Sequence, residues 1–248
     1  MPSRVFTVLL MIFAAPITLA QPSPPLAGLL LQFDNERDYA AKERLLRTVT
    51  GQYAGSGPEL LRLAQSTANT DTRWLAMRGM AALHFTACAP FLEASLKDSD
   101  IFVRANAARA LGDLRIRTAA APLLAMFDAE REPGAIEQAS LALRVLEIRA
   151  AAPYIREKIP AFTGQTRGWL IQALGTLGSI ADVPLIAGYL EEMAGDAATQ
   201  AIQELTGVSF GPRSVGISSF PPPETIAAQA WWKAHKTEWP RCDDCRPR

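Results

Sequence analysis

The chain has 248 residues, of which 25 are basic and 25 acidic, so its formal net charge at pH 7 is zero. This balance excludes the dense positive charge by which many proteins hold nucleic acid or anionic membranes. Alanine and leucine are abundant and runs of β-branched residues are few, which favours helices over strands.

Residues 1–20 have the features of a secretory signal peptide. Arg4 supplies a positive charge, residues 5–15 are apolar apart from Thr7, and small residues precede a cut after Ala20. The apolar run is too short to span a bilayer comfortably, and an uncleaved anchor is the alternative. We therefore expect an exported protein, periplasmic or secreted, that has no stable membrane insertion after cleavage. Residues 21–33, which begin Gln-Pro-Ser-Pro-Pro, are predicted to be a proline-rich linker.

The rest of the chain repeats a two-helix unit. In each unit the second helix is predicted to start at a proline, because proline is tolerated in the first turn of a helix. These prolines, at intervals of 32, 32, 31 and 31 residues, are Pro58, Pro90, Pro122, Pro153 and Pro184. The first helix of each unit carries apolar residues three positions apart, such as Leu111 and Leu114, which share one face.

A period near 31 residues with two helices per period predicts an all-α solenoid, a right-handed α–α superhelix of about six helix pairs. One pair cannot bury its apolar face alone, and stacking on neighbours buries it. Small residues from Ala107 to Gly112 would let the first helices approach closely. The repeat domain is expected to cover residues 34–240, in units of about 34–67, 71–98, 100–131, 133–160, 164–193 and 196–240, before a tail at 241–248.

The segment from Asp100 to Gly112 reads Asp-x-x-Val-Arg-x-x-Ala-Ala-x-Ala-Leu-Gly. This pattern resembles the HEAT repeat, and more narrowly the short bacterial HEAT-like repeats that are also found in phycobilin lyases. The resemblance is sharp for residues 98–128, good for 71–98 and 163–193, and weaker for 133–160.

The resemblance implies that a turn aspartate and a helix arginine pair within and between repeats. The pairs it suggests are Asp71 with Arg73, and Asp98 or Asp100 with Arg104. Arg167 starts the corresponding helix of a later unit. The fourth unit has Ile136 at this place. We therefore expect the series of arginine pairs, called the arginine ladder below, to be interrupted there.

The last unit departs from the others. Its first helix is expected to stop at Thr206-Gly207, and its second to start near Pro223 after an insertion rich in Gly, Ser and Pro. The LTGVSFG and WW elements resemble the closing unit of many exported bacterial HEAT-like proteins. Trp231, Trp232 and Trp239 are interpreted as a cap over the last apolar groove, with an aromatic binding face as the alternative.

Motifs of catalysis are absent from the sequence. The two histidines, His84 and His235, stand alone, and we expect a protein that is not an enzyme and holds no metal or cofactor. Cys242 and Cys245 are interpreted as a structural disulfide, which export would favour. A redox pair, half of a metal site, and free or intermolecular thiols are the alternatives. Cys88 is predicted to be a buried small apolar residue.

The leading functional hypothesis is a monomeric scaffold or adaptor whose partner is another protein and not a nucleic acid. We expect the partner to dock on a concave surface made by successive second helices. Candidate contacts are Trp231, Trp232, Arg115 and Arg117, although scattered arginines are more often solvated. A chromophore lyase or chaperone, by similarity to phycobilin lyases, is the alternative against which export argues. A redox or metal role of the cysteine pair is the third.

Overall fold

The computed structural model describes residues 25–212, 221–237 and 239, and these residues form thirteen α-helices and no strand. The all-α prediction is therefore confirmed. The predicted signal peptide, and Cys242 and Cys245 with their predicted disulfide, lie outside the described residues. The helices are α1 (Leu26–Asn35), α2 (Tyr39–Gln52), α3 (Gly57–Ser66), α4 (Thr70–Ala82), α5 (Ala89–Ser95), α6 (Ile101–Asp113), α7 (Ala120–Ala129), α8 (Pro133–Val145), α9 (Ala152–Lys158), α10 (Gly164–Leu177), α11 (Val183–Ala187), α12 (Gly195–Thr206) and α13 (Pro223–His235).

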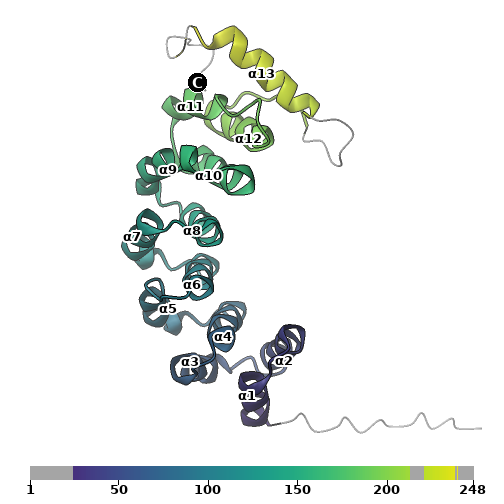
Figure 1. Ribbon diagram of the computed structural model, residues 1–248, viewed down its shortest axis with the longest axis vertical. Coiled ribbons are helices and arrows are strands. Elements are labelled where there is room, and N and C mark those ends of the chain that lie inside the picture. Colours follow the sequence, from purple (N-terminus) through teal and green to yellow (C-terminus); the bar gives the residue numbers. More distant parts are fainter. Residues whose placement is uncertain (1–24, 213–220, 238, 240–248) are drawn as a thin grey trace, which may run out of the picture.

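The helices stack in one curved row, with α1 and α2 at one end and α13 at the other (Figure 1). The inner helices α4, α6, α8 and α10 line the concave side, and the outer helices α3, α5, α7, α9 and α11 form the convex side (Figure 1). Successive inner helices pack closely, whereas successive outer helices contact one another much less. The row therefore bends towards the inner helices.

The prediction that second helices make the concave surface is wrong, because the inner helices are the first helices of the units. Small residues on the inner helices explain the direction of the bend. A Cβ atom added to Gly112 would lie 3.0 Å from the Cα atom of Ala142 on α8, and one added to Gly175 would lie 2.7 Å from the Cα atom of Ala201 on α12. Glycine thus permits a backbone approach that shortens the row on this side.

The predicted helix starts are confirmed. Proline occupies one of the first two positions of α3, α5, α9 and α11, and Pro122 is the third residue of α7. The apolar stripe of the inner helices forms the core, where Leu111, Leu143 and Leu174 are fully buried. The repeat pattern in the sequence therefore identifies the residues that stacking removes from water.

The N-terminal end differs from its prediction, because α1 is a helix where a linker over residues 21–33 is expected. Leu29 and Phe33 lie four positions apart on α1, and both are buried where α1 meets α2 and α3. The following helix starts at Tyr39 rather than at residue 34, after Asp38 accepts a hydrogen bond from the backbone N–H of Ala41 at 2.7 Å. The burial of this apolar stripe thus stabilises a helix directly after a proline-rich segment.

The C-terminal end follows its prediction where it is described. Gly207 ends α12 with φ 73°, a left-handed conformation that glycine adopts without strain. α13 begins at Pro223. The rings of Trp231 and Trp232 each lie 6.1 Å from the ring of Trp239, and all three side chains are half-buried.

Three turns between inner and outer helices hold non-glycine residues in the left-handed region, at His84 (φ 51°), Arg115 (φ 55°) and Glu147 (φ 57°). This conformation costs a non-glycine residue roughly 1–2 kcal/mol. We expect Arg115→Gly to raise the free energy of unfolding by about 0.5 kcal/mol, because glycine's looser unfolded state offsets part of the relief. Calorimetry would show a higher melting temperature. Arg149→Gly, at a turn residue outside this region, should lower it, and a lower value for both variants would contradict the strain argument.

Candidate binding surfaces

Arginines at the starts of three inner helices each pair with an acid near the end of the same repeat. Arg73 pairs with Asp98 at 3.0 Å, Arg104 pairs with Glu130 at 2.8 Å, and Arg167 pairs with Glu192. Each acid lies 25 or 26 residues after its arginine, less than one period, so each pair joins the inner helix of a repeat to the end of the same repeat.

Two predicted pairings within the ladder are wrong. Asp71 accepts a hydrogen bond from the indole N–H of Trp74 at 3.2 Å and does not pair with Arg73. Asp100 caps α6, accepting from the backbone N–H groups of Phe102 and Val103 at 2.8 and 3.1 Å. The first N–H groups of a helix have no partner inside the helix, and they hold this carboxylate in place of Arg104. Arg104 does not bind the carboxylate of Asp98 either; its Nη1 atom donates to the backbone carbonyl oxygen of Asp98 at 3.0 Å.

Each of these arginines also closes the end of the preceding outer helix. The hydrogen-bond acceptors are the carbonyl oxygens of Thr67 for Arg73, Asp98 for Arg104 and Phe162 for Arg167. Carbonyl groups at helix ends lack partners inside the helix, so these bonds satisfy them. The ladder therefore has a structural role.

The fourth unit interrupts the ladder, as the sequence predicts, since Ile136 is fully buried. In this unit Lys158 of α9, rather than an arginine, donates hydrogen bonds to the carbonyl groups at the end of α7. Its Nζ atom donates to the carbonyl oxygens of Asp128 and Glu130 at 2.9 and 3.1 Å and lies 5.4 Å from the ring centre of Phe127. Burial is the main cause that lowers the pKa of the Lys158 ammonium group.

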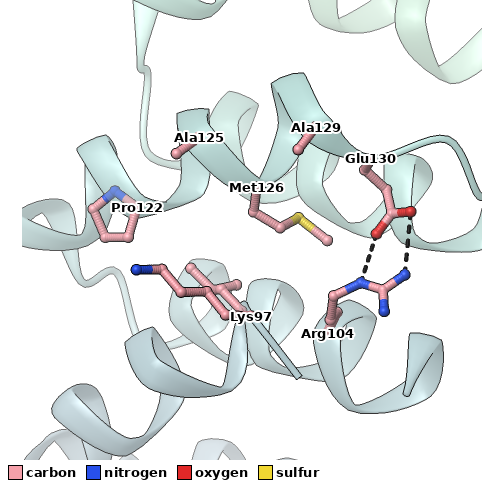
Figure 2. A pocket seen from close by; sticks show the side chains of 8 residues that line it. Lys97, Arg104, Pro122, Ala125, Met126, Ala129 and Glu130 are labelled. Carbon is pink, nitrogen blue, oxygen red and sulfur yellow. Dashed lines mark hydrogen bonds and ion pairs between the residues drawn. The ribbon is translucent and has the colours of Figure 1, made fainter. Parts of the chain in front are cut away.

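A groove of about 440 Å³ lies between α5 and α7 on the convex side (Figure 2). Leu96 and Met126 line its apolar part, and the Arg104–Glu130 pair lies at one end (Figure 2). The Nε, Nη1 and Nη2 atoms of Arg104 all donate within the chain. Of the charged side chains in the groove, that of Lys97 alone makes no hydrogen bond or ion pair with the part of the chain that is described. The groove follows mainly from the wide spacing of the outer helices.

Glu130 makes the ladder sensitive to acid. Burial acts to raise the pKa of its carboxyl group, but hydrogen bonds from Arg104 and from the backbone N–H groups of Glu132 and Arg131 outweigh burial and hold this pKa below the ordinary 4.5. The unfolded chain therefore takes up the proton first as pH falls, and the stabilising contribution is complete above the ordinary pKa and is lost below it.

We expect Glu130→Gln to lower the free energy of unfolding at pH 7 by about 1–2 kcal/mol, since it weakens a charge-assisted hydrogen bond. Urea unfolding at pH 7 and at successively lower pH would show the difference from the wild type shrinking below about pH 4.5. A difference that stays constant with pH would contradict the assignment. Asp128→Asn, at an exposed neighbouring carboxylate, is the control.

The concave face carries a stripe of exposed and half-buried residues along α6, α8 and α10. On α6 this stripe contains Phe102, Asn106, Arg109 and Asp113. The same positions, all exposed or half-buried, are Gly134, Gln138, Leu141 and Val145 on α8 and Gln165, Trp169, Gln172 and Thr176 on α10. Bonds between neighbouring inner helices hold parts of it in place. They include Arg78 to Glu43 at 2.8 Å, Arg144 to Gln172 at 3.2 Å and Thr176 to Glu204 at 3.1 Å.

An aromatic ridge, made by Tyr39, Trp74 and Phe102, crosses α2, α4 and α6. The ring of Trp74 lies 5.8 Å from that of Tyr39 and 6.4 Å from that of Phe102. The outer two residues are 49% and 60% exposed, respectively. The sequence analysis did not predict this ridge. A signal was present, because Phe102 occupies the repeat position that the exposed Asp71 occupies one repeat earlier, and an aromatic residue there is expected to face solvent.

The structure does not bring together the predicted contact residues. Arg115 and Arg117 are exposed in the turn after α6, where Arg117 pairs with Glu147 at 3.1 Å. Trp232 lines a different groove of about 630 Å³ between the end of α11 and α13, at the far end of the row. These residues cannot form one binding site.

Cys88 is buried and free, as predicted, and its Sγ atom donates to the carbonyl oxygen of Phe85 at 2.8 Å. Burial raises the pKa of this thiol to about 11, so it remains protonated and unreactive near neutral pH. Among the described residues, no group of three or more His, Cys, Asp or Glu side chains is placed to hold a metal ion. None of the described helices is long and apolar enough to cross a membrane.

Comparison with known proteins confirms the repeat class. Residues 57–144, from α3 to the end of α8, match the model of HEAT repeats. A chain of "the complex of CpcE and CpcF of phycocyanin lyase" from Nostoc sp. PCC7120 has a similar fold, with a TM-score of 0.54, 17% sequence identity and coverage of 80% of each chain. No curated protein matches the sequence. Residues 57–144 thus carry HEAT repeats, and the chain as a whole has the fold of an α-solenoid.

Proposed function

We propose that this chain, which carries HEAT repeats over residues 57–144, is an exported, non-catalytic scaffold that binds another protein on its concave face. The observation that supports the proposal is the stripe of exposed and half-buried residues along α6, α8 and α10. A curved row of parallel elements offers an extended partner many weak contacts on rigid supports. The Arg104–Glu130 ion pair of the convex groove, in contrast, is engaged in holding α6 to the end of α7.

A capture experiment with matched variants tests the proposal. The chain from Gln21 onward would be cross-linked in an envelope extract of its source cell. The concave variant combines Arg109→Glu, Gln165→Arg and Gln200→Glu. The convex control combines Arg62→Glu, Ala94→Arg and Ala121→Glu at exposed positions, so that the two variants change the net charge equally. We expect the concave variant to lose a saturable protein partner that the control keeps, with both variants melting like the wild type. Equal capture by both variants would reject the concave face.

Export is part of the same proposal and is tested separately. Mass measurement on protein purified from the envelope or medium should give the mass of a chain starting at Gln21. A full-length chain confined to the cytoplasm would reject export.

A chromophore lyase or chaperone role remains the alternative, since a chain of the phycocyanin lyase complex shares the fold. At 17% identity that likeness concerns fold and not activity. Incubation with a free bilin would favour the alternative if a stable, saturable absorbance change appeared. No change at excess bilin would leave the scaffold proposal in place.

A further inference from the structure

A polar cavity of about 310 Å³ lies between α4 and α6, next to the aromatic ridge. Arg78 lies on its α4 side, Asn106, Arg109 and Asp113 lie on its α6 side, and His84 comes from the turn after α4. Three alanines complete the lining, and their short side chains leave the space open. Because Asn106, Arg109 and Asp113 belong to the exposed stripe of α6, the cavity opens on the concave face.

Two guanidinium groups from successive repeats face this cavity with donors to spare. Arg78 uses its Nη1 atom for Glu43 at 2.8 Å and for the hydroxyl group of Tyr39 at 3.3 Å. Its Nε and Nη2 atoms donate to no group in the described part of the chain. The Nε atom of Arg109 is 3.6 Å from Asp113, too far for a hydrogen bond, and both side chains are about half exposed. Free, planar N–H groups of this kind match the two oxygens of a carboxylate.

Arg78 also connects the cavity to the aromatic ridge. Its guanidinium carbon lies 6.0 Å from the ring of Trp74, so it borders both surfaces. On α6, Phe102 of the ridge and Asp113 at the far end of the cavity are eleven residues apart, or about 16 Å along a helix. An extended peptide of about five residues covers that length. Tyrosine, tryptophan and arginine are the residues that most often dominate the energy of protein interfaces.

We propose that this surface binds an extended acidic segment of the partner protein, with carboxylates on Arg78 and Arg109 and an apolar or aromatic side chain on the ridge. The inference rests on the scaffold function and names the chemistry of its partner. The complementary charge is the free donor set of the two arginines. Asp113 is the one carboxylate that lines the cavity, and it opposes such a ligand.

Binding of two labelled peptides tests the inference. The probes are a fluorescein-labelled peptide of one phenylalanine followed by four glutamates, and the same peptide with four glutamines. Fluorescence anisotropy at low salt should show saturable binding of the glutamate peptide and at least tenfold weaker binding of the glutamine peptide. Equal binding of the two peptides, or no binding of the glutamate peptide up to 1 mM (about −4 kcal/mol), would overturn the proposal.

Three variants locate the site. Arg109→Gln should weaken binding of the glutamate peptide at least fivefold, and Asp113→Asn should strengthen it, because a repelling charge is removed. Arg149→Gln makes the same charge change at an exposed turn outside the cavity and should leave binding within twofold. Equal weakening by both arginine variants would indicate attraction by overall charge and overturn the site.

The outcome is separable from that of the proposed function. A protein partner that is captured through Gln165 and Gln200, with no binding of the glutamate peptide, would overturn the acidic-segment inference and keep the scaffold. Binding of the peptide at Arg109, without any protein captured on the concave face, would retain the pocket and reject the scaffold.

Discussion

Leu111→Asp is expected to abolish cooperative folding of the repeat array. Leu111 is fully buried on α6, which packs closely against both α4 and α8. Truncating a buried leucine costs about 2–5 kcal/mol, and burying an unpaired carboxylate adds several kcal/mol. The sum is comparable with the whole stability of a typical domain, about 5–15 kcal/mol. Because each repeat is stabilised by its neighbours, damage at α6 should spread in both directions.

Circular dichroism during heating would measure this effect. The variant should show reduced helix content at 25 °C and no cooperative transition. Ala121→Asp adds the same carboxylate at an exposed position in the first turn of α7 and should melt within about 1–2 °C of the wild type. A wild-type melting curve for Leu111→Asp would show that the buried stripe has been assigned to the wrong residues.

The fold was predictable because two independent patterns repeat with one period. Prolines at the starts of outer helices and apolar pairs such as Leu111 and Leu114 on inner helices both follow from local rules of helix formation. The helix α1 was not predicted, because the prolines before it suggested a linker. Its Leu29 and Phe33 have a buried face only once α2 and α3 are in place.

The partners in the arginine ladder were less predictable than the arginines. Asp71 and Asp100 stand close to Arg73 and Arg104 in sequence, but both carboxylates are used locally near the start of a helix. The true partner of Arg104 is Glu130, 26 residues later. Which acid meets an arginine depends on how the outer helix of the same unit packs on the inner helix, and the pattern of the inner helix alone contains no information on that packing.

The concave surface was predicted on the wrong helices for a related reason. The small residues of the inner helices predict that these helices approach closely. A close approach on one side of the row also bends the row towards that side, and this consequence determines which helices form the concave surface. Once one side of the row is packed more tightly than the other, the bend and the exposed stripe follow. Tyr39, Trp74 and Phe102 meet only through that stacking, so each appears in the sequence as an isolated aromatic residue.

Gly175→Val is expected to lower the free energy of unfolding by about 3 kcal/mol, at the upper end of the usual range for overpacking. A Cβ atom at Gly175 would lie 2.7 Å from both the Cα and the Cβ atom of Ala201, so α10 and α12 would have to separate. Backbone cannot give way as a flexible side chain can. For a chain of this size the loss corresponds to a fall of roughly 6–12 °C in melting temperature.

The same substitution at other glycines gives a graded control. Gly134 lies in α8 with nothing within 4 Å of its added Cβ atom, so Gly134→Val should be nearly neutral. Gly112→Val should fall between the two, since its Cβ atom would lie 3.0 Å from Ala142 Cα. Urea unfolding of the three variants should rank them in the order of these distances. Because helix propensity changes in the same direction at all three positions, that ranking isolates the close approach that bends the row and creates its concave face.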